Sequence, residues 1–259
     1  MPFLPLDGCE LYYETTGSGP ALVFAHGLAG NHLSWWQQVP HFRGRYTCVT
    51  FAHRGFWPST GAAEPERFAS DLAALIDHLA FDDVRLIAQS MGGWTCLSYA
   101  LRHPERVRAL AMSGSTGTFA HPEIDRIHAE ARRDGNPEAD LFARGVHPAA
   151  GERMAREQPE LHYLYQRISD LSDEVDRQAV RRALVAMRTT PPETLAALRT
   201  PLLCVSGQED IVVPPAAVAL FASLAPGGRL ERVPEAGHSV YFERAATYNR
   251  LVDEFLASA

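Results

Sequence analysis

The chain has 259 residues and no lysine, because all 24 of its basic side chains are arginine. It therefore has no lysine amine with which to form a Schiff base, build the phosphate loop of many nucleotide-binding enzymes or run Ser-x-x-Lys acylation. Any cationic contact to a substrate must come from arginine or a protonated histidine. Codon bias in a GC-rich genome also produces this composition, so by itself it indicates no function.

Cysteine is also scarce, and the four cysteines stand far apart without a Cys-x-x-Cys pair. They are Cys9, Cys48, Cys96 and Cys204. This pattern favours small buried hydrophobic side chains in a reducing compartment over a disulfide framework or a zinc site. Residues 1–8 lack a basic stretch followed by an apolar run, and no apolar run is long enough to span a membrane. We expect no signal peptide, no membrane partner and a cytoplasmic protein.

The remaining absences concern charge and metal ligands. The net charge is -7 and there is no basic run, which argues against nucleic acid as a partner. No His-Glu-x-x-His or similar string of metal ligands is present, so we expect no metal and no cofactor. The length allows one large domain, or a core domain with an insertion.

Short apolar runs alternate with helical stretches along most of the chain, which predicts an α/β fold with a mostly parallel, twisted sheet covered by helices on both faces. The strand-like runs are 11–15, 21–25, 46–51, 84–88, 107–112, 201–206 and 229–233. The alternation stops over residues 118–198, which contain helical stretches but no strand-like run. We therefore expect a core of residues 1–117 and 199–259 and a helical lid at 118–198. The lid is inserted on the strand-to-helix side, where such sheets bind ligands; a helical decoration remote from the site is the alternative.

Ser90 stands between a predicted strand and a predicted helix, where residues 88–92 read Ala-Gln-Ser-Met-Gly. A serine on such a tight turn holds its hydroxyl above the sheet. The residues two before and two after it must be small, because the chain folds back on itself. Gly92 meets this requirement, and Ala88 replaces the glycine that is usual in the first position. An ordinary serine at a helix N-cap is the alternative.

A serine hydroxyl needs a base to become a nucleophile. His238, on a loop after the last predicted strand and preceded by a glycine, is the candidate. A carboxylate must in turn fix the tautomer of the histidine. Asp210 follows the run 201–206 and is the first candidate for this role, with its neighbour Glu209 the weaker one. The other suitable loop, residues 113–115, contains no carboxylate.

The order Ser90, Asp210, His238 resembles that of the α/β-hydrolase superfamily, and the resemblance covers nearly the whole chain. Within it, the chain is similar to the small lid-bearing serine hydrolases: enol-lactonases, esterases, carbon–carbon bond hydrolases of ring-cleavage products and cofactor-free haloperoxidases. The resemblance implies an α/β-hydrolase fold with a helical lid inserted between strands. A serine nucleophile disfavours haloalkane dehalogenase and epoxide hydrolase chemistry, which use an aspartate.

The resemblance also implies an oxyanion hole. In the family, the loop that begins here at His26 supplies one backbone amide, which by position is that of Leu28, and Met91 supplies the second. Such donors stabilise the tetrahedral oxyanion of acyl transfer. His26 itself is expected to shape the loop.

One loop departs from the family pattern, which in many members reads Asp-x-Arg-Gly-x-Gly-x-Ser. Here residues 52–59 read Ala-His-Arg-Gly-Phe-Trp-Pro-Ser, so Ala52 replaces the aspartate and Trp57 the second glycine. Altered packing of the loop or a reshaped pocket wall would each explain the change. Arg54, on this loop, is a candidate contact to an anionic substrate.

Other side chains near these loops are candidates to line a pocket. Trp94 lies one helical turn after Ser90, although core packing would explain it equally well. His32 follows the oxyanion loop and is a candidate polar contact to substrate. Further aromatic side chains in the predicted lid are Phe119, Tyr163 and Tyr165.

Together these residues predict a serine hydrolase of a small carboxylic ester or lactone, acting through an acyl-enzyme on Ser90. His238 takes the serine proton and passes it to the leaving alcohol, while Asp210 orients His238. One alternative is carbon–carbon bond hydrolysis of a ring-cleavage diketone, in which Arg54 or Arg188 would bind a second carboxylate. The other is a slow-turnover ligand receptor on the same fold. The expected partner is a small-molecule substrate, and the sequence leaves the acyl chain length and the oligomeric state open.

Overall fold

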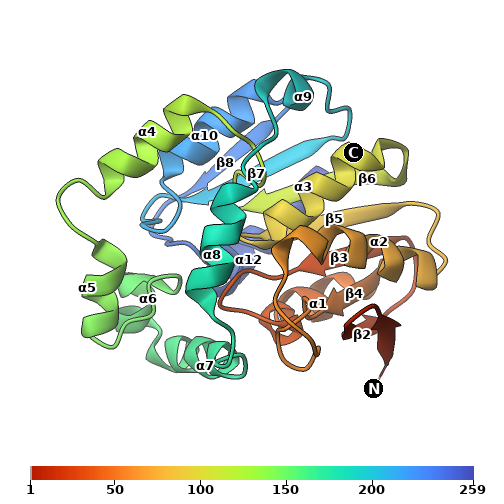
Figure 1. The fold of residues 1–259 in the computed structure, drawn as a ribbon, viewed down its shortest axis with the longest axis horizontal. Helices are drawn as coiled ribbons and strands as arrows, with labels where there is room; N and C mark the ends of the chain where they lie inside the picture. The colour runs from red at the N-terminus through yellow and green to blue at the C-terminus, as the bar shows by residue number, and fades with distance from the viewer. Residues whose placement is uncertain (1) are drawn as a thin grey trace.

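The central strands are apolar along their whole length, which is why they lie in the middle of a sheet covered on both faces. All residues of β3 (Ala21–Ala25) and of β7 (Leu202–Gly207) are buried. The computed structural model describes residues 2–259, and its strands form one eight-stranded sheet in the order β1-β2-β4-β3-β5-β6-β7-β8 (Figure 1). The other strands are β1 (Phe3–Leu6), β2 (Cys9–Thr16), β4 (Thr47–Phe51), β5 (Val84–Gln89), β6 (Val107–Ser113) and β8 (Arg229–Val233).

The sheet is mostly parallel, as the sequence predicted. Only the pairs β1·β2 and β2·β4 are antiparallel among the described strands. Each strand-like run coincides with a strand to within two residues at either end. The sequence analysis missed β1, because only Leu4 of its four side chains is buried and the strand carries no clear apolar run. The four cysteines are buried with free thiols.

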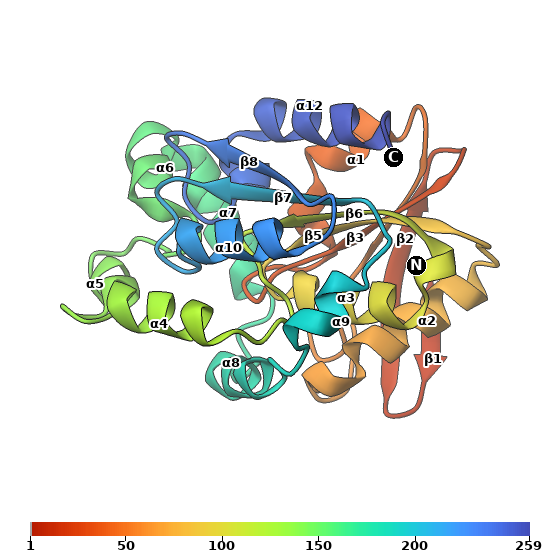
Figure 2. The ribbon, with the colours of Figure 1, turned by 90° about the horizontal axis from the view of Figure 1, so that it is seen from above.

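Helices cover both faces of the sheet (Figure 2). One face carries α1 (Gln38–Phe42) and α12 (Ala245–Leu256), and the other carries α2 (Phe68–His78), α3 (Gly92–Arg102) and α10 (Pro215–Leu224). The short elements are η1 (His32–Trp35), η2 (Pro65–Arg67), η3 (Pro104–Arg106) and α11 (Val240–Glu243). Within residues 2–259 no helix is both long and apolar enough to cross a membrane.

Between β6 and β7 the chain forms six helices, and residues 114–201 contain no strand. Since β6 and β7 are parallel neighbours, this helical insertion leaves and re-enters the sheet between adjacent strands. Its helices are α4 (Pro122–Ala131), α5 (Pro137–Ala143), α6 (Gly151–Glu157), α7 (Pro159–Asp170), α8 (Arg177–Ala186) and α9 (Pro192–Ala196). All six lie within the predicted range 118–198, and the division of the chain into two domains stays a prediction.

Candidate active site

Ser90 stands on a strained turn between β5 and α3. Its φ is +48°, a left-handed value that few residues other than glycine adopt. Its amide donates a hydrogen bond to the Ser113 carbonyl at 2.9 Å, and its carbonyl accepts one from the Gly93 amide at 2.8 Å. The Ser115 hydroxyl also donates to that carbonyl at 2.8 Å. These bonds fix the turn, and Ser90 lines a cavity of about 520 Å³.

The small residues around Ser90 are required by close packing against the sheet. A Cβ on Gly92 would lie 2.1 Å from the carbonyl oxygen of Ala25, so the first turn of α3 packs directly on β3. Ala88 is fully buried in β5, where its single methyl group is accommodated. Met91 is the N-cap residue of α3, and it lines the same cavity as Ser90.

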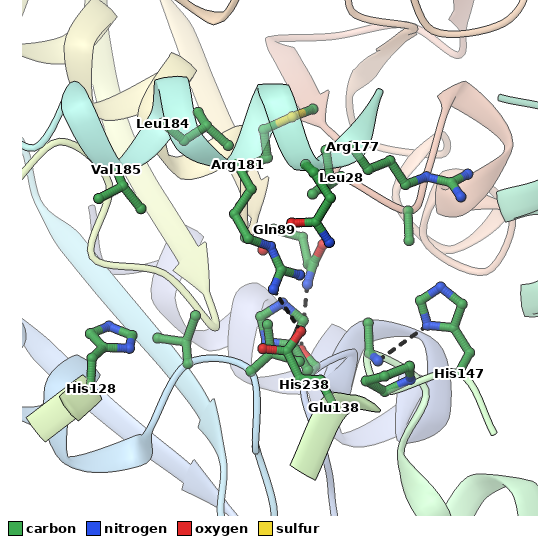
Figure 3. Close-up of a pocket in the computed structure, with 18 of the residues that line it drawn as sticks. Leu28, Gln89, His128, Glu138, His147, Arg177, Arg181, Leu184, Val185 and His238 are labelled. Atoms are coloured by element: carbon green, nitrogen blue, oxygen red, sulfur yellow. Dashed lines mark hydrogen bonds and ion pairs between the residues drawn. The ribbon is translucent and has the colours of Figure 1, made fainter. Parts of the chain in front are cut away.

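The structure brings His238 and Asp210 together on the loops that follow β8 and β7. His238 Nδ1 lies 2.8 Å from Asp210 Oδ2, and both side chains are buried. The other oxygen of Asp210 accepts hydrogen bonds from the amides of Val212 at 2.8 Å and Val213 at 2.9 Å. With both oxygens engaged, Asp210 holds the proton on Nδ1 and leaves Nε2 of His238 available as a base. His238 lines the cavity, as Figure 3 shows.

Glu209, the weaker candidate for the acid, does not take part in this arrangement. Its half-exposed carboxylate pairs with Arg153 of the helical insertion at 2.6 Å. The guanidinium of Arg153 lowers the pKa of Glu209 by hydrogen bonding, as expected of a surface ion pair. Of the two adjacent carboxylates, therefore, only Asp210 reaches His238.

Gly114 is a residue of the site that the sequence analysis did not find. Its φ is +55°, and a Cβ there would lie 2.8 Å from His238 Nδ1 and 3.2 Å from Asp210 Oδ2. The backbone at Gly114 therefore lies directly against the His238–Asp210 pair, with no room for a side chain. In the sequence, the signal for this position is a glycine between two serines on the loop after β6.

The loop at 26–30, which is expected to supply an oxyanion amide, is fixed by hydrogen bonds to the Gly27 carbonyl. His26 Nδ1 lies 2.8 Å from this oxygen, and the Gly30 amide donates to it at 3.0 Å. The Gly27 carbonyl and the Leu28 amide belong to one planar trans peptide, so their bonds point in opposite directions. Fixing the carbonyl therefore also fixes the direction of the Leu28 N–H, and Leu28 lines the cavity.

His53 holds His26 in place, and Thr95 in turn holds His53. Its Nε2 accepts the backbone amide of His53 at 2.9 Å, so the proton of the neutral ring must be on Nδ1, where it donates to Gly27. His53 Nδ1 lies 3.0 Å from the same Nε2, and His53 Nε2 lies 2.9 Å from the Thr95 hydroxyl of α3. Burial lowers the pKa of His26 to about 3 and that of His53 well below its usual value, so both rings are neutral.

The prediction that Arg54 contacts substrate is wrong. Its guanidinium is buried and clasps Asp71 of α2 through Nε at 2.6 Å and Nη2 at 2.7 Å. Its Nη1 donates to Glu64 at 3.1 Å. Arg54 is absent from the described cavity wall, because its guanidinium is bound to these two carboxylates.

The structure places His32 outside the described cavity wall, and its contact to substrate stays a prediction. Its buried ring packs edge-on against Tyr12 at 4.6 Å between centroids and lies beside Trp57 at 5.7 Å. Trp94, in contrast, does line the cavity, and its indole N–H donates to the Leu184 carbonyl of α8 at 2.8 Å. This bond joins α3 to the helical insertion.

The three aromatic residues of the insertion that the sequence analysis named lie in different environments. Tyr165 lines the cavity, and its hydroxyl accepts a hydrogen bond from Ser239, next to His238, at 3.1 Å. Tyr163 is 62% exposed, and Phe119 is buried against Phe221 of α10.

The cavity wall built by the insertion is charged, and of its charged residues the sequence analysis named only Arg188. Arginine occurs at helical spacing at 177, 181 and 188, on α8 and just beyond its end, and this spacing was the available signal. Figure 3 shows Arg181 and Glu138 extending toward each other from opposite sides of the cavity. The charged residues of the wall are Asp125, Arg132, Glu138, Arg177, Arg181 and Arg188.

Two histidines of the insertion complete the wall. Burial lowers the pKa of His128 to about 4 and that of His147 to about 3, so both are neutral at pH 7. Across residues 2–259 no group of three or more histidine, cysteine, aspartate or glutamate side chains is arranged to hold a metal ion.

A parallel sheet with a serine turn after β5 and a His–Asp pair after β7 and β8 defines the architecture of the α/β hydrolases. Residues 20–150 match the family described as alpha/beta hydrolase fold, which is half of the chain. The chain belongs to this family.

Individual relatives span nearly the whole chain. A putative non-heme bromoperoxidase, BpoC, of Mycobacterium tuberculosis is 29% identical over 96% of this chain and 98% of its own length. A 2-hydroxymuconate semialdehyde hydrolase of a Pseudomonas species is 26% identical over 97% of this chain and 92% of its own. The solved structure of Est816, described as an N-acyl homoserine lactone degrading enzyme, superposes with a TM-score of 0.78 at 27% identity, covering 98% and 100% of the two chains.

Proposed function

We propose that the protein is a serine hydrolase that cleaves a small carboxylic ester or lactone through an acyl-enzyme on Ser90. One observation carries the proposal. Ser90, on its left-handed turn, lines the same cavity as His238, whose Nδ1 lies 2.8 Å from the buried carboxyl group of Asp210. A nucleophile, a base and the group that orients the base are the parts that acyl transfer requires.

The proposed reaction has two stages. His238 Nε2 takes the proton of the Ser90 hydroxyl as its oxygen attacks the substrate carbonyl, and the amides of Leu28 and Met91 bind the oxyanion. The tetrahedral intermediate collapses, the carbon–oxygen ester bond breaks, and the leaving alkoxide receives the proton from His238. In a lactone this alcohol stays attached to the acyl group. Water, deprotonated by His238, then releases the acid and restores Ser90.

The names of the relatives support a hydrolase, and they differ in the bond that is cleaved. The lactone-degrading activity named for Est816 supports an ester or lactone. The relative named as a semialdehyde hydrolase supports, as the alternative, cleavage of a carbon–carbon bond. A cavity of about 520 Å³ suits a small molecule as the substrate. The four free, buried thiols are consistent with work in the cytoplasm, which we propose as its location.

Steady-state turnover of a panel of p-nitrophenyl esters, lactones and vinylogous diketones tests the proposal, with Ser90→Ala as the control. We expect turnover of an ester or lactone and its loss, by a factor of about a thousand or more, in Ser90→Ala. Undiminished turnover in Ser90→Ala would refute the mechanism. Turnover of the diketones alone would establish the alternative, and saturable binding without turnover would indicate a receptor.

A further inference from the structure

The peptide that directly precedes His238 has both of its polar groups bound. Its carbonyl, that of Ala236, accepts a hydrogen bond from the Glu209 amide at 2.8 Å. Its amide, that of Gly237, donates to Oε1 of Glu243 at 2.7 Å. Because a peptide is planar, bonds to its carbonyl and its amide together fix its orientation. The backbone therefore enters His238 from a peptide that is held on two sides.

Among the described residues, Glu243 supplies the only acceptor for the Gly237 amide. Gly237 is buried, so loss of the carboxyl oxygen would leave a donor without a partner, which is costly. The loop can lower this cost only by shifting its backbone toward another acceptor. The remaining side-chain contact to the backbone here is weaker, because Gln89 Nε2 lies 3.5 Å from the His238 carbonyl.

Glu243 is a hydrogen-bonding group and not half of an ion pair. Its side chain is buried, and within residues 2–259 its Oε2 has no hydrogen-bond partner. The neighbouring cation, Arg244, is directed elsewhere: its Nε donates to the Glu235 carbonyl at 3.0 Å, and its Nη2 lies 3.5 Å from Glu157. Burial raises the pKa of Glu243 to about 8, so the carboxyl group is mostly protonated at pH 7.

The helix α11, which carries Glu243, is anchored by contacts that do not use the carboxyl group. Gln38 Nε2 of α1 donates to the Tyr241 carbonyl at 2.8 Å. Gln158 Nε2, just before α7, donates to the backbone carbonyl of Glu243 at 3.2 Å. These two bonds hold the helix from two other elements. The carboxyl group of Glu243 therefore acts on the loop before α11 and not on the helix itself.

We propose that Glu243 is a positioning residue for His238: through the Gly237 amide it sets the peptide that precedes the base, and with it the direction of the imidazole. The inference rests on the proposed function, because that function assigns His238 as the base. A small displacement of a base lowers the rate of proton transfer without changing how the substrate is bound. The bond from Gly237 therefore contributes to kcat and not to KM.

The test compares two substitutions of Glu243 on an ester that the wild type hydrolyses. Glu243→Met keeps the length of the side chain but has no oxygen to accept from Gly237. It should lower kcat by about tenfold or more and leave KM within about twofold. Glu243→Gln keeps an acceptor oxygen and places an amide nitrogen where the protonated acid has its hydroxyl. It should retain kcat within about threefold at pH 7.

Gln38→Met is the matched control, because it also removes a buried hydrogen bond to α11 but leaves the Gly237 amide bound. It should lower the melting temperature and keep kcat within about twofold. Should Glu243→Met not fold, Glu243→Asp withdraws the acceptor by one methylene group and should also lower kcat. Wild-type kcat in the variant that folds, or an equal loss in Glu243→Gln or Gln38→Met, would overturn the positioning role and leave the proposed function intact.

A measurement without turnover keeps the two proposals separate. The proton that His238 Nδ1 shares with Asp210 should give a low-field proton resonance in the Ser90→Ala protein. Adding Glu243→Met should shift or broaden this resonance, and adding Glu243→Gln should leave it in place. If no ester is hydrolysed but the resonance responds in this way, the proposed function fails and the positioning role stands. A resonance that Glu243→Met leaves unchanged would refute the positioning role.

Discussion

At the scale of single residues, the two carboxyl oxygens of Asp210 bind different partners. One oxygen holds His238, while the other is tied to two backbone amides of the loop that follows β7. The carboxyl group therefore has no freedom to rotate away from the imidazole. An aspartate fits this position because its short side chain keeps the loop amides and the ring within reach together.

Asp210→Asn should lower kcat by about a hundredfold or more, because an amide that donates to Nδ1 favours the wrong tautomer of His238. The measurement is steady-state turnover of an ester that the wild type hydrolyses. Glu209→Gln is the matched control on the neighbouring residue and should stay within about twofold of wild type. Equal losses in both variants would contradict the assignment of the acid.

His26 should act on the reaction through the Gly27–Leu28 peptide. His26→Ala removes the donor to the Gly27 carbonyl and should lower kcat by about a hundredfold, with KM within about twofold. His26→Asn places an amide donor near the position of Nδ1 and should recover part of kcat. A trifluoromethyl ketone, which forms an oxyanion on the enzyme, should bind in the same order. A change in KM alone, or equal loss in both variants, would refute the positioning role.

Residue types and order were enough to predict Ser90, His238 and Asp210 as a set, and the structure brings the last two into contact. Arg54 shows why other residues were not predictable. A single arginine on a loop looks the same in sequence whether it faces a cavity or a buried acid. Its partner Asp71 lies seventeen positions away, and nothing in the pattern pairs the two.

At the scale of elements, the loop after β6 controls the space available to the His–Asp pair. Gly114→Ala should lower kcat by about tenfold or more, because the new Cβ would lie 2.8 Å from His238 Nδ1 and the backbone φ of +55° disfavours a side chain. Gly44→Ala, where a Cβ meets nothing within 4 Å, should leave kcat and the melting temperature unchanged. Wild-type kcat in Gly114→Ala would show that the pair tolerates displacement.

The strands were predictable from their short apolar runs. The helices α2, α3 and α12 were predictable because their apolar positions recur at helical spacing. The orientation of α8 relative to the site was not, because its pattern shows an apolar face with Val180 and Leu184 but not the element against which that face packs. Trp94 fixes it, through the indole bond to Leu184 and the packing of Val180. A contact between elements ninety residues apart has no local sequence signal.

At the scale of the whole molecule, buried neutral histidines predict an acid limit to stability. Burial lowers the pKa of His26 and His147 to about 3 and that of His128 to about 4, from an ordinary value of 6.5. Below pH 6.5 the unfolded chain binds more protons than the folded one, so the free energy of unfolding falls as the pH is lowered. Glu243 acts in the opposite sense, because burial raises its pKa to about 8 and the folded state retains its proton.

The melting temperature should therefore be highest near pH 6.5, fall on acidification to pH 5, and fall more gently toward pH 8. His147→Asn keeps an acceptor for the Ala149 amide but has no titratable ring, so it should flatten the acid side of the curve. The expected difference is about 2 kcal/mol in the free energy of unfolding between pH 6.5 and 5. A melting temperature that is constant from pH 7 to 5 would contradict the burial of neutral rings.

The central claim is that Ser90 becomes acylated, and covalent labelling tests it most directly. The wild type is treated with a p-nitrophenyl alkylphosphonate, and the adduct is located by intact-protein mass spectrometry and peptide mapping. The account predicts a single phosphonyl group on the peptide that contains Ser90, loss of hydrolysis in step with labelling, and no adduct in Ser90→Ala. A label on another residue, or full activity in a protein labelled at Ser90, would contradict it.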